Sequence, residues 1–276
     1  MEAECQALIE IFDRFDVTVY RTEELTDEMV AANFGEKWLV NGYMTSYSRD
    51  PIFVVGDNVI ELAPGAPNRR AELLAYRKLL YDRVEPTSAK WVQMPMADAR
   101  NLTDPEYTKE THAALEGGDL LVLGKTVLVG TSLNPKVGSS ALGFEWLRDL
   151  LEPQGYTVER VRIGEEFLHL DVVLSVPRDG VAILCPDAFV DGIPSYFDGW
   201  DLIEVTKDQA QFLACNGMPL DPDNYILGYN DVEDGSTVQE GLEEHGITVH
   251  RIAYENHTED GGSIRCTCHP LVRELS

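Results

Sequence analysis

The segment GGSIRCTCHPLVRE (261–274) places Cys266, Cys268 and His269 within four residues. Two thiols and an imidazole this close can be metal ligands, a redox pair, buried packing or, for one thiol, a nucleophile. A structural zinc site is disfavoured, because the thiols form CxC rather than CxxC, the chain has no second pair, and His269 is too close to complete a tetrahedron alone. The chain has five cysteines, an odd number without a framework spacing, so we expect reduced thiols.

The chain is strongly acidic, with 48 Asp and Glu against 22 Lys and Arg and a formal net charge of −26. Such a field repels phosphate backbones and anionic membrane surfaces, so we expect neither nucleic acid nor membrane as a partner. No run of about 18 apolar residues is present. The first residues, MEAECQALIEIFDRF, carry acids where a signal peptide needs a basic patch. These features predict a soluble, cytoplasmic protein.

The residues that could do chemistry need elements to position them, and an order of hairpin, helix and strand recurs along the chain. In the first unit, residues 38–63 form two β-rich runs around a turn at 56–58, residues 70–84 space leucines at helical intervals, and residues 90–95 are strand-like. The next three units repeat this order, with hairpin turns at 124–125 and 178–180 and closing strands YTVERVRI, DLIEVT and ITVHRIAY.

The fifth unit is split between the two ends of the chain. Residues 263–270 (SIRCTCHP) supply a strand, while the helix ECQALIEIFDRF and the strand VTVYR (17–21) come from the start. Five units closed head to tail predict a five-bladed α/β propeller with pseudo-fivefold symmetry, formed by residues 1–276 as a single domain. An ordinary α/β domain of alternating elements is the competing interpretation.

A ring of related units brings equivalent strand ends to its axis, so polar residues should recur at matching places. They do: Asp50 follows the first run of unit one, and the later units carry Glu116 and Asp119, His169 and Asp171, Asn216, and Cys266. This register places the site at the centre of the ring.

Four motifs in these places carry a family resemblance: SRDP (48–51), LEGGD (115–119), HLD (169–171) and GGSIRC (261–266). In this order and at these separations they resemble the guanidino-group-modifying, or pentein, superfamily, whose fold is a five-bladed α/β propeller. Stretches such as RDPIFVVGDNVIELA and LGFEWLRDLL are most similar to the glycine amidinotransferase family. The resemblance covers roughly residues 38–274.

The resemblance implies a role for each motif residue, and the roles suit a guanidinium group. Its carbon is a poor electrophile, so the reaction needs a thiolate, a grip on the cation and an acid for the departing amine. The implied roles are Cys266 as nucleophile, with a pKa lowered by the substrate cation and His169; His169 as general acid and then base; Glu116 as its orienting carboxylate; Asp50 and Asp171 as guanidinium acceptors; and Asn216 as a contact to the substrate's amino acid end. Cys268 is expected to be structural, and neither a cofactor nor a metal is expected.

The predicted activity is transfer of the amidino group of arginine, or a related guanidino compound, to an amine acceptor through an amidino-cysteine intermediate. The alternative is a guanidino hydrolase, such as an arginine deiminase, an arginine dihydrolase or a dimethylarginine hydrolase, in which water replaces the acceptor. A non-catalytic binder of guanidinium or polyamine is a third hypothesis. We expect small-molecule partners and allow for a homodimer.

One position departs from the amidinotransferase pattern. The family holds the donor's carboxylate with an arginine where this chain has Ala188. Arg49, Arg178 or Arg265 could take over that contact, or the donor could lack a carboxylate.

Overall fold

The computed structural model describes residues 1–39, 43–96, 98–104 and 106–273. Residues 40–42, which belong to the predicted first β run, and residue 97 lie outside the described part. Within the described residues, no helix is long and apolar enough to cross a membrane.

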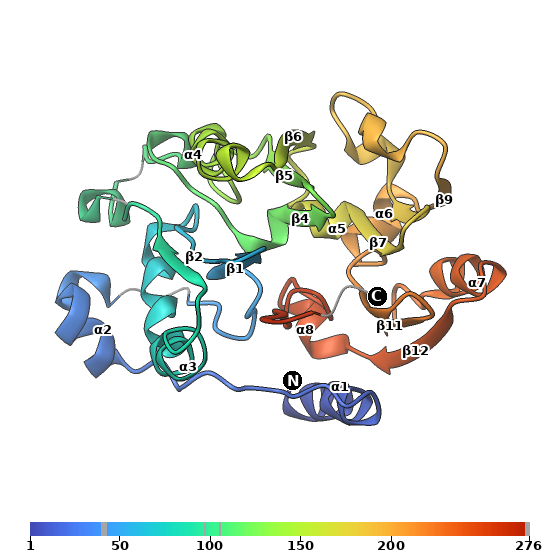
Figure 1. Ribbon diagram of the computed structural model, residues 1–276, viewed down its shortest axis with the longest axis horizontal. Coiled ribbons are helices and arrows are strands. Elements are labelled where there is room, and N and C mark those ends of the chain that lie inside the picture. Colours follow the sequence, from blue (N-terminus) through green and yellow to red (C-terminus); the bar gives the residue numbers. More distant parts are fainter. Residues whose placement is uncertain (40–42, 97, 105, 274–276) are drawn as a thin grey trace.

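Four small sheets follow one another around the view in Figure 1, and each has three strands. In every sheet the first two strands pair antiparallel and the third joins the second in parallel. The strands are β1 (Ile52–Val55), β2 (Asn58–Glu61) and β3 (Lys90–Gln93); β4 (Leu120–Leu123), β5 (Thr126–Ser132) and β6 (Thr157–Ile163); β7 (Leu174–Arg178), β8 (Val181–Leu184) and β9 (Asp201–Glu204); and β10 (Met218–Asp221), β11 (Asn224–Tyr229) and β12 (Thr248–Ala253). The predicted order of hairpin and parallel strand is confirmed for four units.

The hairpin turns lie where the sequence predicts them. Gly124, between β4 and β5, has φ +59°, and Gly180, between β7 and β8, has φ +82°. Both tight turns need the left-handed backbone region, which glycine enters without steric cost.

The helices lie mainly outside this ring of sheets (Figure 1). They are α1 (Glu2–Arg14), α2 (Asp27–Phe34), α3 (Arg77–Arg83), α4 (Ala141–Leu151), α5 (Leu170–Val173), α6 (Lys207–Gln211), α7 (Ser236–Glu244) and α8 (Glu255–Glu259). The helix predicted over residues 70–84 is a 3-10 helix in its first half and an α-helix in its second. A 3-10 helix, η2 (Pro67–Tyr76), leads directly into α3.

Apolar side chains shared between neighbouring sheets form the core. Phe53 and Ile60 of the first sheet pack in one cluster with Leu120 and Val127 of the second. A larger cluster joins the second, third and fourth sheets through Leu128, Ile183 and Leu227 among others. Each sheet thus buries its faces against the next, which fixes the relative positions of the loops that enter the first strands.

The predicted fifth sheet is wrong. Residues 17–21 and 263–270 are described and contain no strand. In the second stretch, Thr267 N donates to Ser263 O at 3.2 Å and Cys268 N to Arg265 O at 3.2 Å, so turns use the groups that a strand would offer to a neighbour. Over the residues that the structure describes, the chain therefore has an α/β fold with four sheets, and a fifth blade is not confirmed.

Helix α1 and the C-terminal segment, residues 261–273, lie between the fourth and first sheets (Figure 1). Leu8, Ile11 and Phe12 of α1 pack against the fourth sheet and against Ile264. Two single backbone bonds tie the segment to its neighbours: Arg265 N donates to Asn216 O and Arg49 N donates to Cys266 O, each at 3.0 Å. These bonds bring the cysteine segment to the loops that precede β10 and β1.

Candidate active site

Four of the predicted site residues precede the first strand of a sheet. Asp50 lies ahead of β1, Glu116 ahead of β4, His169 ahead of β7 and Asn216 ahead of β10. Asp50 was expected to follow a β run, but the described residues before it form turns rather than a strand. All four side chains are buried.

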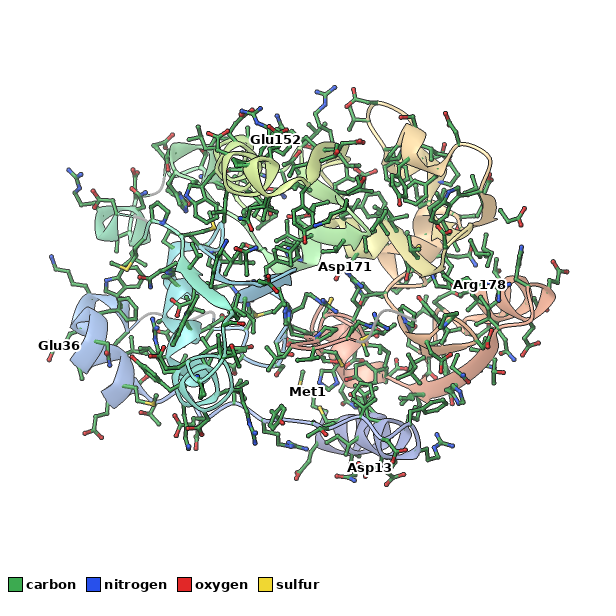
Figure 2. The ribbon with its side chains drawn as sticks, in the orientation of Figure 1. Met1, Asp13, Glu36, Glu152, Asp171 and Arg178 are labelled. Atoms are coloured by element: carbon green, nitrogen blue, oxygen red, sulfur yellow. The ribbon has the colours of Figure 1, made fainter. Side chains whose placement is uncertain are left out.

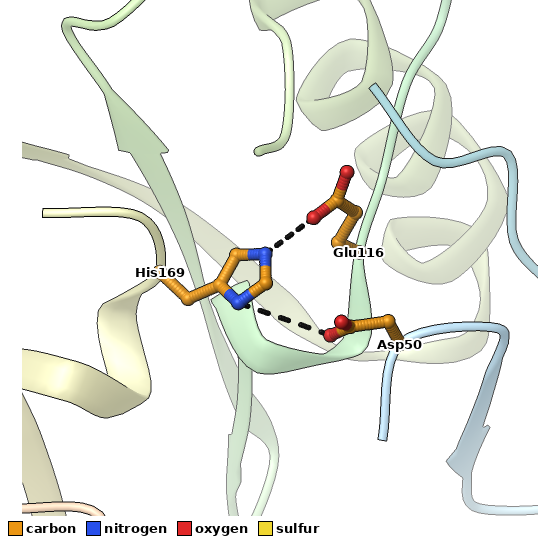
Figure 3. A group of neighbouring side chains, drawn as sticks. All are labelled: Asp50, Glu116 and His169. Atoms are coloured by element: carbon orange, nitrogen blue, oxygen red, sulfur yellow. Dashed lines mark hydrogen bonds and ion pairs between the residues drawn. The ribbon is translucent and has the colours of Figure 1, made fainter. Parts of the chain in front are cut away.

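His169 lies between two carboxylates (Figure 3). Its Nε2 is hydrogen-bonded to Glu116 Oε2, and its Nδ1 is 3.9 Å from Asp50 Oδ1. Figure 3 shows the three side chains converging from three separate loops. The structure therefore brings together the predicted acid–base residue, its orienting carboxylate and one guanidinium acceptor.

The two glycines of LEGGD allow this approach. A Cβ on Gly118 would lie 2.5 Å from His169 Nδ1, and one on Gly117 would lie 2.0 Å from Arg49 O. Gly118 N also donates to Asp50 Oδ1 at 3.0 Å. Only glycine leaves room for the imidazole and for the neighbouring backbone.

Asp119 holds two of the site loops together. Its Oδ1 accepts from Leu170 N at 2.9 Å and its Oδ2 from Ser139 N at 2.8 Å. Burial raises the pKa of Asp119 to about 6. This carboxyl group therefore positions the loop that carries His169.

Arg69 is a site residue that the sequence analysis missed. Its guanidinium donates from Nη2 to Asp50 Oδ2 at 3.1 Å, from Nε to Glu72 Oε1 at 3.0 Å, and lies 3.6 Å from Glu116 Oε2. Because η2 is a 3-10 helix, residues three apart lie on the same side, which brings Arg69 and Glu72 together. An arginine in a leucine-rich helical pattern is typical of a surface position, so the local pattern contains little signal of this burial.

Asp171, Asn216 and Cys266 form the second half of the site. Asn216 donates from Nδ2 to Asp171 O at 3.1 Å and accepts from Cys266 N at Oδ1 at 3.3 Å. Both ends of its side-chain amide therefore join the two predicted site residues. Among the described residues, neither carboxylate oxygen of Asp171 has a hydrogen-bond partner, and the nearest cationic atom, Arg265 Nε, is 3.5 Å from Oδ2.

The acidic groups of the site raise the pKa of both its thiol and its imidazole, whereas burial raises the first and lowers the second. Burial, and then the charges of Asp171 and Asp50, raise the pKa of Cys266 well above its usual value. Burial lowers the pKa of His169, but the charge of Asp50 and the hydrogen bond to Glu116 outweigh it and raise the pKa to about 10. The lowered thiol pKa expected from the sequence depends on a substrate cation; the protein's own groups do not supply it, because burial and the charges of Asp171 and Asp50 raise the pKa.

The spacing of Asp50, Glu116 and His169 is also close enough for a metal ion, since one ligand atom from each lies within 4.8 Å of the others. Two features oppose a metal here. Arg69 already supplies a positive charge to both carboxylates, and a metal would need an imidazole without its proton, whereas the pKa of His169 is raised.

The structure places two of the three candidate carboxylate-binding arginines in the site and the third outside it. Ala188 is buried in the core shared by the second, third and fourth sheets. Arg178 donates to His245 O at 2.6 Å, and it lies toward the outer side of the view in Figure 2 while Asp171 lies toward the middle. Arg49 and Arg265 are buried in the site, where Arg49 Nε donates to Arg265 O at 3.2 Å.

One histidine outside the four motifs is deeply buried. His257 is 1% exposed and its Nδ1 is 2.6 Å from Glu4 Oε2. The neighbouring residues of His257 in ENHTED are polar, a context typical of a surface position.

Comparisons with known proteins agree with the motifs. No family model matches the chain. It is 29% identical over 174 residues to putative inosamine-phosphate amidinotransferase 2 of Streptomyces griseus, covering 60% of this chain and 48% of the relative. It is 24% identical over 261 residues to mitochondrial glycine amidinotransferase of Gallus gallus, covering 82% and 59%. The chain thus spans about half the length of these curated relatives.

Solved structures show the fold. SxtG, an amidinotransferase of Microseira wollei from saxitoxin biosynthesis, matches with a TM-score of 0.80 and 20% identity, over 100% of this chain and 84% of that one. Dimethylarginine dimethylaminohydrolase and an arginine dihydrolase match with TM-scores of 0.58 and 0.61. The chain is therefore similar to the guanidino-group-modifying superfamily and, within it, to glycine amidinotransferase.

Proposed function

We propose that the protein is an amidinotransferase that uses Cys266 as its nucleophile. The observation that carries the proposal is a set of buried groups: an imidazole bonded to Glu116 with Asp50 3.9 Å away, and a Cys266 thiol that Asn216 links to Asp171 and that the charges of Asp171 and Asp50 reach. The similarity to amidinotransferases supports the same reaction.

In the first half-reaction, Asp50 and Asp171 receive the guanidinium of arginine or a related donor. The carboxylate oxygens of Asp171, which accept no hydrogen bond from the described residues, suit the planar N–H groups of this cation. Its charge offsets the two carboxylates that raise the pKa of Cys266, so the thiol releases its proton to solvent as the donor binds.

The thiolate then attacks the guanidino carbon, and a C–S bond forms as the bond to the departing amine breaks. The raised pKa of His169 keeps it protonated near neutral pH, so it can give the amine its proton. Neutral His169 next takes a proton from the acceptor amine, which attacks the amidino carbon and frees the thiolate. Glu116 holds the ring in place throughout.

Arg49 and Arg265 are proposed to receive an anionic end of the donor. The Nη2 of Arg49 and the Nε of Arg265 are buried and lack hydrogen-bond partners among the described residues. Two buried guanidinium groups so close together favour an anion between them. Position 188, by contrast, offers only a methyl group within the core.

We also propose where the fifth unit of the fold lies. Helix α1 and residues 261–273 fill the place between the fourth and first sheets, and they bond to residues on both sides. We assign them to the fifth unit of a pentein-type propeller whose sheet is reduced to turns.

The test is incubation of the protein with guanidino-labelled arginine, with and without glycine or another amine, followed by mass spectrometry of the products. Transfer predicts ornithine together with the labelled amidino product of the amine, and only when the amine is present. Citrulline that forms equally with and without an amine would show hydrolysis instead. Cys266→Ser should lose about 10⁴-fold or more in turnover, whereas Cys268→Ser should retain it.

A further inference from the structure

We propose that Cys5 is a second reactive thiol, served by His257 as its base and Glu4 as the orienting carboxylate, and that it is modified by small cationic disulfides. Cys5 Sγ lies 3.7 Å from His257 Nε2, and His257 Nδ1 lies 2.6 Å from Glu4 Oε2. The three groups join α1 to α8 and are separate from the cluster around His169.

The hydrogen bonds keep Glu4 ionised and orient the imidazole of His257. Asn256 donates to Glu4 Oε1 from its backbone N at 2.7 Å and from Nδ2 at 2.9 Å. Burial raises the pKa of Glu4, but these bonds and that of His257 outweigh it and lower the pKa to about 2. An ionised carboxylate only accepts, so Nδ1 of His257 donates to Glu4, and Nε2 is the ring nitrogen that lies beside the Cys5 thiol.

The base is held rigidly, while the thiol can be reached. The ring of Tyr254 stacks on His257 at 4.5 Å between centroids, and Tyr47 Oη donates to His257 O at 2.9 Å. His257 is 1% exposed, whereas Cys5 is partly exposed. A buried, oriented imidazole beside an accessible thiol is the arrangement that raises cysteine reactivity.

A hollow of about 350 Å³ adjoins the cluster and points to the class of reagent. It is lined by Met1, Asn256, Glu259 and Asp260. Two of these residues contact Glu4: the α-amino group of Met1 lies 3.5 Å from Glu4 Oε2, and Asn256 Nδ2 donates to Glu4 Oε1 at 2.9 Å. The hollow therefore lies beside the cluster. The wall carries two carboxylates, Glu259 and Asp260, and one cation, the α-ammonium of Met1, which is already paired with Glu4, so its net charge attracts a cation and repels an anion.

The proposed step is thiol–disulfide exchange. His257 Nε2 takes the proton of Cys5, the thiolate attacks one sulfur of the disulfide, and its S–S bond breaks as a new S–S bond forms to Cys5. The departing thiolate takes the proton from His257. No other oxidant is required.

Two other free thiols are expected to be much less reactive than Cys5. Cys185 and Cys215 are fully buried, and burial raises the pKa of each. Neither has an imidazole partner among the described hydrogen bonds. They should stay unmodified in the folded protein.

The experiment compares three disulfides of equal reactivity class and different charge: cystamine, which is cationic, bis(hydroxyethyl) disulfide, which is neutral, and dithiodipropionate, which is anionic. Modification of Cys5 is followed near neutral pH by peptide-level mass spectrometry. The reference is a synthetic peptide of residues 1–14, which carries the same thiol and the same Glu4 without His257. We expect Cys5 of the folded protein to react at least about tenfold faster with cystamine than the peptide does, and dithiodipropionate to be slowest.

Variants separate base from charge. His257→Gln and Glu4→Gln should each slow modification, whereas Glu2→Gln, which removes the same charge from the exposed first turn of α1, should not. Glu259→Gln should narrow the gap between cystamine and the neutral disulfide. The proposal is overturned if the folded protein reacts no faster than the peptide, a result that needs no variant to fold, or if the rates do not follow reagent charge.

Discussion

The molecule holds two thiols whose surroundings differ. Burial and the charges of Asp171 and Asp50 raise the pKa of Cys266, and Asp50 also lies 3.9 Å from His169, whose pKa is raised as well. Cys5 is partly exposed, and its Sγ lies 3.7 Å from Nε2 of His257. The comparison teaches that burial and nearby acids make a thiol hold its proton, whereas a partly exposed thiol can lie directly beside an imidazole.

The largest expected effect is the loss of stability when Arg69, the shared cation of the cluster around His169, is removed. Arg69→Leu leaves Asp50, Glu72 and Glu116 buried without their shared cation, and we expect a loss of about 3–5 kcal/mol in the free energy of unfolding. Urea titration followed by circular dichroism measures it. Arg162→Leu is the matched control, since its pair with Asp191 is exposed and should contribute about 1 kcal/mol or less. Equal losses in the two variants would mean that the cluster around His169 carries no special charge balance.

The pH dependence of stability should distinguish the imidazole of His169. Its folded pKa of about 10 lies above its ordinary value of 6.5, so the folded state keeps a proton that the unfolded chain releases. The resulting stability is fully present below pH 6.5 and is lost as pH rises toward 10. We expect this loss to be on the order of 2–4 kcal/mol in the wild type and to be largely absent in His169→Gln.

Denaturant melts at intervals across that range provide the measurement. His250→Gln serves as the control, because burial lowers rather than raises the pKa of His250. An unchanged alkaline slope in His169→Gln would mean that His169 is neutral in the folded protein, and the proposed proton donation to the leaving amine would fail with it.

Local patterns predicted the sheets well because hairpins and their turns are local. Apolar runs around Gly124 and Gly180 sufficed to place strands and turns. The segment 263–270 alternates in a strand-like way, yet its backbone groups bond within turns and to residues 49 and 216, which no local pattern records. The fifth sheet was predicted for that reason and is not there.

The site was predictable where motifs carried it and hidden where partners lay far apart in sequence. The motifs placed Glu116 and His169 together, and the structure agrees. Arg69 was missed because its three acidic partners lie in three different segments. His257 was missed because its hydrogen-bond partner, Glu4, lies 253 residues away in the sequence.

The smallest expected effect concerns the second thiol cluster and lies at the opposite end of the pH scale. The folded pKa of Glu4, about 2, is below its ordinary value of 4.5, so its stabilising bonds are present above pH 4.5 and are lost as pH falls through 2. Glu4→Gln should cost about 1 kcal/mol at neutral pH and nothing at the acid end, while Glu2→Gln should be flat throughout. Acid denaturation curves of the two variants decide the matter: if they coincide, Glu4 is not the anchor of His257, and the reactivity of Cys5 would have to come from elsewhere.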